Sequence, residues 1–263
     1  MTTDTTNPGG SAARRAFEGK VVLVTGASTG IGRATAIAFA AAGARLILGD
    51  IDKRSAGTAE AIVAAGSEAR FIPTDVSDPE SVRTLVEAAV QTYGRLDVAF
   101  NNAGLLPPTA DFADMTVQDF DRTIAVDLRG VFLCMKYEIA AMLKTGGGAI
   151  VNTASVAGLV ADPGMASYVA AKHGVVGLTK AAALDYATRN IRVNAVAPGL
   201  VATPMTNRWL EDPEFAAQLM QNSPMKRPAQ PEEISGTVLH LCSSAASFTT
   251  GQTFLVDGGQ TAH

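Results

Sequence analysis

Short apolar runs alternate with longer amphipathic or Ala-rich segments from about residue 20 onward. The runs, rich in Val, Ile, Leu and Phe, predict strands at 21–24, 45–48, 69–74, 96–100, 148–153, 192–196 and 253–256. The segments between them predict helices near 31–42, 54–65, 78–93, 117–143 and 166–188. Short, nearly continuous apolar runs are typical of parallel strands that are buried on both faces. The pattern therefore predicts one α/β domain over residues 16–263: a Rossmann-like, doubly wound parallel sheet with helices on both faces.

Two segments fall outside this alternation. Residues 1–15 are polar and contain Gly and Pro, which predicts a disordered N-terminal tail. The Pro-containing stretch at about 200–228 precedes the last predicted strand and is expected to carry short helices. We expect this stretch to form a substrate lid over the carboxyl ends of the strands, where such sheets bind ligands.

Composition narrows the functional classes. The chain has a formal net charge of −4, with 47% hydrophobic and 17% charged residues, which argues against a disordered chain and against a general nucleic-acid binder. Its apolar runs fall short of the roughly 20 residues that a membrane span needs. Cys134 and Cys242 stand in apolar runs and are expected to be buried free thiols, and no metal-ligand spacing occurs. No apolar segment follows Arg14-Arg15, so we expect a cytoplasmic protein rather than an exported one.

A glycine-rich turn, TGASTGIG at 25–32, joins the first predicted strand to the first predicted helix. Gly26, Gly30 and Gly32 would let the backbone turn tightly and approach a pyrophosphate at the helix N-terminus. The motif is not a P-loop, because no Gly-Lys-Ser/Thr follows. Taken alone it is also compatible with a turn that binds nothing.

Asp50 ends the second predicted strand, 18 residues after Gly32. A carboxylate at this place accepts hydrogen bonds from the adenosine ribose and repels the additional phosphate of NADP. No Lys or Arg interrupts the glycine turn, so the residues favour NAD. Lys53 and Arg54 follow closely, and NADP stays an alternative.

A candidate catalytic group stands in the second half of the chain. Tyr168 and Lys172 are four residues apart, on one face of a predicted helix. A nearby cation lowers the pKa of a phenol from its usual value of about 10, so Tyr168 is a candidate general acid/base for alcohol–ketone conversion. Ser155 follows a predicted strand and is expected to hold the substrate oxygen. Singly, each motif also fits an ordinary surface pair or a loop serine.

Together and in this order, the motifs resemble those of the short-chain dehydrogenase/reductase family. The resemblance covers about residues 17–260 and rests on TGASTGIG, Asp75-Val76, NNAG at 101–104, Ser155, YVAAK at 168–172, NAVAPGLVAT at 194–203 and VDGG at 256–259. It implies that Ser155, Tyr168 and Lys172 are catalytic. With the residues above, it implies a cofactor site made of Gly26, Ser28, Thr29, Gly30, Ile31, Gly32, Asp50, Ile51, Asp75, Val76, Asn102, Ala103, Gly104, Thr153, Tyr168, Lys172, Pro198, Gly199, Val201 and Thr203.

One residue departs from the family pattern. Asp127 stands where the resemblance implies an Asn that completes a catalytic tetrad through its main-chain carbonyl. We include Asp127 among the catalytic residues, because the carbonyl survives the change. A charge there would favour the Lys172 ammonium and disfavour a tyrosinate, so we expect activity with a shifted pH optimum.

The expected substrate wall is apolar and comprises Leu105, Val156, Met165, Met205 and Trp209. It indicates a hydrophobic or cyclic secondary alcohol, or its ketone, and segments 130–143 and 171–179 are similar to members that act on cyclic diols and alicyclic alcohols. Apolar lid residues would equally serve only to pack the lid.

The predicted helix that carries Tyr168 is small or apolar on two adjacent sides. One side has Ala170, Gly174, Gly177 and Ala181, and the next has Ala171, Val175, Leu178 and Ala182. One sheet cannot cover so much of a helix, so we expect a homo-oligomer, which by the resemblance is a tetramer or, as the alternative, a dimer.

Two other classes were weighed. A methyltransferase would share the glycine turn and the acid at the strand end, but NNAG, Ser155 and YVAAK argue against it. A catalytically weak NAD-binding regulator on the same fold is the main alternative, and Asp127 gives it some support.

Overall fold

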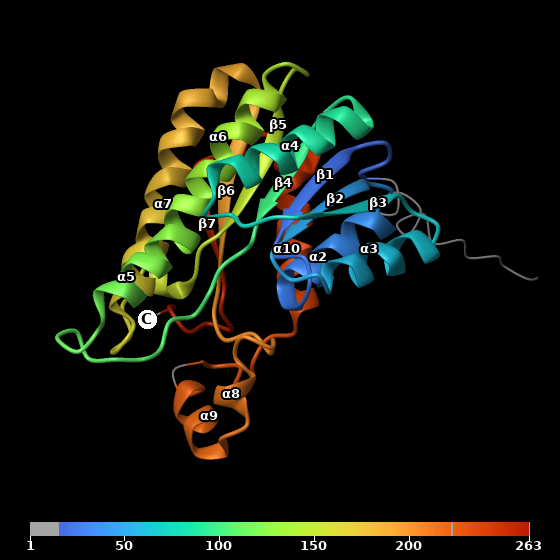
Figure 1. Ribbon diagram of the computed structural model, residues 1–263. Helices are drawn as coiled ribbons and strands as arrows, with labels where there is room; N and C mark the ends of the chain where they lie inside the picture. The colour runs from blue at the N-terminus through green and yellow to red at the C-terminus, as the bar shows by residue number, and fades with distance from the viewer. Residues whose placement is uncertain (1–15, 222, 263) are drawn as a thin grey trace, which may run out of the picture.

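The computed structural model describes residues 16–221 and 223–262, so the predicted tail at 1–15 lies outside the described residues. One seven-stranded sheet forms the centre of the molecule, in the order β3-β2-β1-β4-β5-β6-β7 with every neighbouring pair parallel (Figure 1). The strands are β1 Val21–Thr25, β2 Arg45–Asp50, β3 Ala69–Pro73, β4 Val98–Asn101, β5 Gly148–Thr153, β6 Ile191–Pro198 and β7 Thr253–Val256. The predicted single, doubly wound α/β domain is confirmed.

Helices cover both faces of the sheet (Figure 1). On one face Phe39, Ile62 and Ile234 pack into a core with alternate strand residues, and on the other face Leu85, Ile139 and Val175 do so. The first face carries α2 Gly30–Ala41, α3 Ser55–Ala64 and α10 Pro231–Cys242, and the second carries α4 Pro79–Tyr93, α6 Gly130–Met142 and α7 Ala166–Tyr186. β1 is buried throughout, which explains its uninterrupted apolar run.

The predicted helix at 117–143 is three consecutive segments. α5 Val117–Thr123 leads into a π-helical segment, η1 Ile124–Arg129, which continues as α6. π-helical turns inside helices are frequent at functional sites, and this one carries Asp127.

The helix α10 was not predicted. It begins with Pro231 in its first turn, and Gln230 and Glu233 form a capping box. Its Ser235 hydroxyl lies 3.0 Å from that of Thr35 on α2. The two helices are therefore hydrogen-bonded to each other on the same face of the sheet. Short 3-10 helices occur at η2 Val156–Gly158, η3 Ala187–Arg189 and η4 Ser244–Ala246.

The segment predicted as a lid carries two short helices, α8 Asn207–Leu210 and α9 Pro213–Leu219, which project from the body near the carboxyl ends of the strands (Figure 1). Its base is held by backbone hydrogen bonds between Leu200, Ala202 and Ala229. Within the described ranges, no helix is long and apolar enough to cross a membrane.

Candidate active site

The glycine turn has a shape that only glycine can supply. Gly26 and Gly30 have positive φ angles of +67° and +53°. A Cβ on Gly26 would lie 2.8 Å from Ala103 Cα, and one on Gly32 only 2.0 Å from the Gly26 carbonyl oxygen. The N-cap residue Thr29 makes no side-chain bond to the first turn of α2. The first N–H groups of α2 are therefore not capped by it, and they suit the pyrophosphate of a dinucleotide.

The side chain and backbone of Asn102 are hydrogen-bonded to this turn. Its Nδ2 donates to the carbonyl oxygens of Thr25 and Gly26, at 3.2 Å each. The Thr25 hydroxyl accepts from the N–H groups of Asn102 and Ala103 at 3.0 and 3.1 Å. The resemblance implied that Asn102 lines the cofactor cleft; its side chain braces the turn that forms the cleft.

Asp50 is fixed at the carboxyl end of β2. Its Oδ2 accepts from Ser28 N–H and its Oδ1 from Asp52 N–H, both at 2.9 Å. Each carboxylate oxygen has a further lone pair for a ribose hydroxyl. Arg54, which follows closely, is paired with Asp52, its Nε donating at 2.6 Å. Ile51, the next residue, is 75% exposed.

The remaining cofactor residues predicted from the resemblance follow the ends of β3, β4 and β6. Asp75 is engaged locally, its Oδ1 accepting from the N–H and hydroxyl of Ser77. Val76 is buried against Gly130. Thr203 lies against the glycine turn, since a Cβ on Gly30 would be 3.0 Å from its Cγ2. The start of the lid thus adjoins the turn. Pro198, Gly199 and Val201 form the approach to it at the end of β6.

Ser155, Tyr168 and Lys172 come together at the carboxyl edge of the sheet. Ser155 caps η2, accepting from Ala157 N–H at 3.1 Å, and its hydroxyl lies close enough to Tyr168 to affect the pKa of the phenol. Lys172 Nζ lies 5.3 Å from the centroid of the Tyr168 ring. The ammonium also donates to the carbonyl oxygen of Thr153 at 3.0 Å, so the last residue of β5 orients it. The three residues predicted to act together are neighbours in space.

Asp127 joins this group through its side chain. It is fully buried, and its Oδ2 lies 3.4 Å from Lys172 Nζ. Its Oδ1 accepts from Leu105 N–H at 2.9 Å, which ties the substrate-side loop after β4 to the π-helical segment. The residue was expected here for its main-chain carbonyl, and its side-chain bond to Leu105 was not predicted from the sequence.

The pKa of Tyr168 is raised above its usual value, opposite to the direction that Lys172 alone would give. Burial is the largest cause, and Asp127 adds to it, whereas Lys172 and the hydrogen bond with Ser155 lower the pKa. Burial lowers the pKa of Lys172, but Asp127 and Tyr168 outweigh this and raise it. Burial likewise raises the pKa of Asp127 against the pull of Lys172. The ammonium is thus shared between a carboxylate and the phenol.

The predicted substrate wall is only partly assembled around Tyr168. Val156 and Met165 are buried beside Ser155 and at the start of α7, and Leu105 lines a pocket of about 90 Å³ with Pro107 and its neighbours. The loops after β4 and β5 meet where Ala110 N–H donates to the Gly164 carbonyl oxygen.

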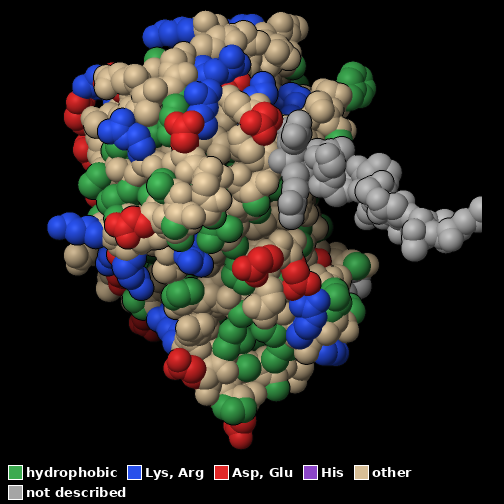
Figure 2. All heavy atoms as spheres, turned by 90° about the vertical axis from the view of Figure 1, so that its right-hand side faces the viewer, with side chains coloured by type: hydrophobic (Ala, Val, Ile, Leu, Met, Phe, Trp, Pro, Cys, Tyr) green, Lys and Arg blue, Asp and Glu red, His purple; other side chains and the backbone are tan. Residues whose placement is uncertain are grey.

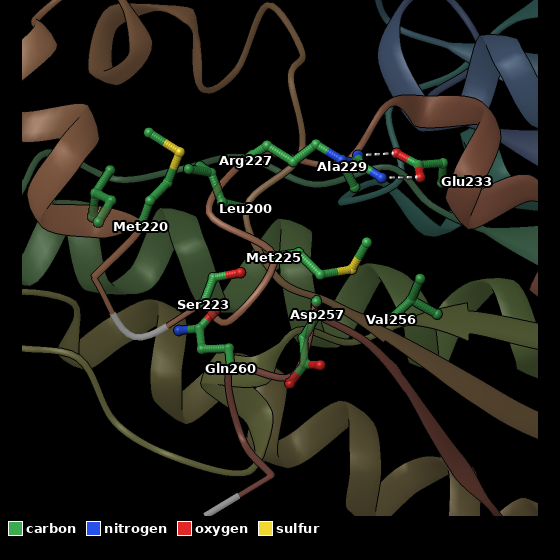
Figure 3. Close-up of a pocket in the computed structure, with 12 residues that line it drawn as sticks. Leu200, Met220, Ser223, Met225, Arg227, Ala229, Glu233, Val256, Asp257 and Gln260 are labelled. Atoms are coloured by element: carbon green, nitrogen blue, oxygen red, sulfur yellow. Dashed lines mark hydrogen bonds and ion pairs between the residues drawn. The ribbon is translucent and has the colours of Figure 1, made fainter.

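Two lid residues, Met205 and Trp209, were also predicted to line the substrate wall. Met205 is 43% exposed, and Trp209 packs edge-to-face on Phe215 with the ring centroids 6.3 Å apart. Figure 2 shows hydrophobic side chains gathered on the lower part of the molecule, where the lid lies. A separate pocket of about 80 Å³ opens at the lid base, between Met220, Met225 and Gln260, and the Arg227–Glu233 ion pair closes one side (Figure 3).

The apolar stripe that predicted a partner helix is partly covered within the chain itself. Ala171 and Val175 are fully buried, and Gly174 lies against Leu128, where a Cβ would come within 2.6 Å. The segment η1 therefore covers part of the side of α7 that was expected to need a partner helix from another subunit. Gly177 and Ala181 are exposed.

The similarity to known proteins extends over nearly the whole chain. Residues 26–261 match the family described as enoyl-(acyl carrier protein) reductase. The chain is 44% identical over 246 residues to cyclohexanol dehydrogenase of Acinetobacter sp. (strain SE19), covering 93% of this chain and 96% of that protein. It is 42% identical over 247 residues to cis-4-hydroxycyclohexanecarboxylate dehydrogenase of Sinomonas cyclohexanicum, covering 94% and 98%. The crystal structure of levodione reductase superposes with a TM-score of 0.90 at 39% identity, over 94% of this chain and 99% of that one.

The chain is an oxidoreductase of the α/β class. It belongs to the short-chain dehydrogenase/reductase family, as its motifs indicated, and the family implies NAD or NADP as the cofactor.

Proposed function

We propose that the protein is an NAD-dependent dehydrogenase/ketoreductase that interconverts a cyclic or otherwise hydrophobic secondary alcohol and its ketone. The observation that carries the proposal is the position of Lys172. Its ammonium faces the Tyr168 ring while Thr153 and Asp127 hold it in place. A cation held there stabilises the phenolate that an alcohol proton must reach.

Each residue has a distinct task in this account. The Ser155 hydroxyl holds the substrate oxygen against Tyr168. In oxidation, Tyr168 Oη accepts the hydroxyl proton, and in reduction it returns that proton to the ketone oxygen. Lys172 stabilises the tyrosinate and would also hold the nicotinamide ribose. NAD, when bound, supplies the hydride acceptor, because the protein itself has no group for hydride transfer.

The preference for NAD rests on Asp50. Its carboxylate is fixed by Ser28 and Asp52 at the end of β2 and would repel the additional phosphate of NADP. The guanidinium of Arg54, which could compensate for that charge, is already engaged by Asp52.

The substrate class rests on the apolar wall and on the relatives. In this proposal Leu105, Val156 and Met165 form the side of the wall near Ser155, and the lid residues Met205, which is exposed, and Trp209, which is half-buried, complete it when substrate binds. The names of the two relatives specify a cyclohexanol and a hydroxycyclohexanecarboxylate. A six-membered alicyclic ring matches both lines of argument.

We also propose a homo-oligomer, most simply a tetramer. Large apolar side chains are exposed on α5, α6 and α7, on one side of the sheet (Figure 1): Phe120 is 41%, Phe132 46% and Leu184 83% exposed. Exposed apolar surface of this kind is typical of subunit interfaces. A monomer by light scattering would contradict this part of the proposal.

The substrate proposal is tested by following NADH formation over a panel of alcohols. The panel comprises cyclohexanol, 4-hydroxycyclohexanecarboxylate, a linear secondary alcohol of equal carbon number and a 3-hydroxyacyl thioester, with NADP tested in parallel. The highest kcat/KM is expected for a cyclic alcohol with NAD. A preference for the thioester would overturn the substrate class while leaving the reaction type intact.

A further inference from the structure

A buried polar cluster lies between the sheet and helices α6 and α7, behind the catalytic group. Its members are Glu138 on α6, Asn101 on β4, Asn152 on β5 and Thr179 on α7, each at most 2% exposed. Asn101 Nδ2 donates to Glu138 Oε2 and to Asn152 Oδ1, both at 3.0 Å. Asn152 Nδ2 donates to the Thr179 hydroxyl at 3.0 Å and to Met135 Sδ at 3.2 Å.

The two Asn side chains of this cluster have no donor left for two of its acceptors. Both N–H groups of Asn101 Nδ2 and both of Asn152 Nδ2 are used. Two acceptors have no partner, Glu138 Oε1 and Asn101 Oδ1. A protonated carboxyl gains one O–H donor that can serve a lone acceptor, directly or through a water.

The surroundings of Glu138 also favour the neutral acid. Within the described residues, its ion-pair and hydrogen-bond partners include no Lys, Arg or His, and the titratable group that faces it is the Cys134 thiol, one turn earlier on α6. A buried carboxylate without a cation is costly. Burial raises the pKa of Glu138 to about 8, which agrees with this count.

The position of the cluster between β4 and β5 indicates what it does in the structure. Asn101 and Asn152 are register partners across β4 and β5. The next residue on each strand faces the site: Asn102 braces the glycine turn, and Thr153 orients Lys172 through its carbonyl oxygen. The hydroxyl of Thr153 also lies 3.4 Å from Asn102 Oδ1. The cross-strand pair therefore fixes the spacing of the two strand ends that carry the cofactor turn and the catalytic ammonium.

We propose that Glu138 is a positioning residue for the active site, a buried proton-bearing carboxyl that locks Asn101 and Asn152 and thereby holds Asn102 and Thr153 in register. This inference deepens the proposed function and rests on it. Small displacements of catalytic groups can cost about 10²-fold in rate. A cluster that does not touch the reacting atoms can therefore affect turnover by shifting the residues that do.

Two substitutions of Glu138 distinguish a positioning role from a role in packing alone. Glu138→Gln keeps an acceptor for Asn101 and supplies N–H donors in place of the O–H donor of the neutral acid, whereas Glu138→Leu fills the space and leaves Asn101 N–H unpaired. Ile139→Ala is the matched control, because Ile139 is the neighbouring buried residue on α6 and contacts the apolar core rather than the cluster. All three are compared by kcat/KM per folded molecule, by NADH affinity from fluorescence, and by amide hydrogen exchange at 99–105 and 150–156.

E138Q is expected to stay within about threefold of the wild type in both kinetics and NADH affinity. E138L is expected to lose about tenfold or more in kcat/KM and to show faster exchange in both segments. I139A is expected to lower Tm without either effect. If E138L does not fold, Thr179→Val makes the same test from the other end of the cluster, with the same losses expected at smaller size.

Three results would overturn the proposal. They are an E138L protein with wild-type kinetics and exchange, an I139A protein with the same losses as E138L, and an E138Q protein as impaired as E138L. Absence of wild-type turnover with every alcohol would instead overturn the proposed function, and hydrogen exchange would still decide the role of Glu138.

Discussion

Asp127 Oδ2 and Lys172 Nζ form an ion pair at 3.4 Å, with side-chain exposures of only 0% and 4%. The same ammonium faces Tyr168. In the family pattern this position carries a neutral Asn. In the proposed mechanism a carboxylate here competes with the tyrosinate for one cation, so that mechanism depends on a residue that departs from the pattern.

The first prediction concerns this competition. Asp127 raises the pKa of Tyr168, so Asp127→Asn should lower it. Alcohol oxidation needs Tyr168 as a base, and its pH–rate profile should therefore move to lower pH, by about one unit. The profile is measured by NADH formation across pH, with Asp121→Asn on the exposed side of α5 as the control. An unchanged profile in D127N would show that the carboxylate does not act on Tyr168.

Gly104 provides a steric test of the same contact. A Cβ on it would lie 3.1 Å from Asp127 Oδ2 and 3.6 Å from Lys172 Nζ. Gly104→Ala should push Asp127 Oδ2 by a few tenths of an ångström, disturb its ion pair with Lys172 and reduce kcat/KM by about tenfold or more. Gly57→Ala is the control, because a Cβ there meets nothing within 4 Å, and it should leave activity unchanged while raising Tm slightly. Equal activity of the two variants would mean that the ion pair tolerates displacement.

The third prediction concerns cofactor choice. Asp50→Ser removes the charge that would repel the additional phosphate of NADP. The ratio of kcat/KM with NADP to that with NAD should rise by about tenfold or more, which corresponds to about 1.4 kcal/mol. Glu60→Gln, an exposed acid on α3, should leave the ratio unchanged. If D50S kept the wild-type ratio, the basis of the preference would lie elsewhere.

Glu138 predicts how stability depends on pH. Its pKa is about 8 in the folded state and near 4.5 when unperturbed, because burial disfavours the charged form. The folded state thus holds a proton that the unfolded state releases between these values. This contribution is complete below about pH 4.5 and is lost as pH rises to about 8, at up to about 1.4 kcal/mol per pH unit.

Glu138→Gln removes that dependence. The Tm difference between E138Q and the wild type should therefore change in favour of E138Q as pH is raised from about 5 to about 9. Thermal unfolding in matched buffers measures it. A constant difference across this range would show that the wild-type carboxyl does not titrate as described.

The sheet and the meeting of Tyr168 and Lys172 could be predicted because their signals are local. A buried strand needs an apolar run, a tight turn needs Gly26, and Tyr168 and Lys172 share a helix face by their spacing alone. These constraints act within a few residues, so one sequence suffices to find them.

The rest depends on contacts between distant segments. The bond from Leu105 to Asp127 and the covering of Gly174 by Leu128 need the π-helical turn, which has no simple sequence pattern. The direction of the Tyr168 pKa was missed because the spacing to Lys172 is visible in the sequence and burial is not. The helix α10 did have a signal, Pro231 followed by acidic residues.

The most direct test of the account compares wild-type protein with Tyr168→Phe, using cyclohexanol and NAD. The wild type should form NADH, preferring NAD to NADP. The variant should lose about 10²-fold or more in kcat, because general acid–base catalysis contributes at least that much, while its NADH affinity stays near that of the wild type. Full activity in the variant would contradict the role of Tyr168. NADH binding by the wild type without turnover of any alcohol would favour the alternative, an NAD-binding regulator on the same fold.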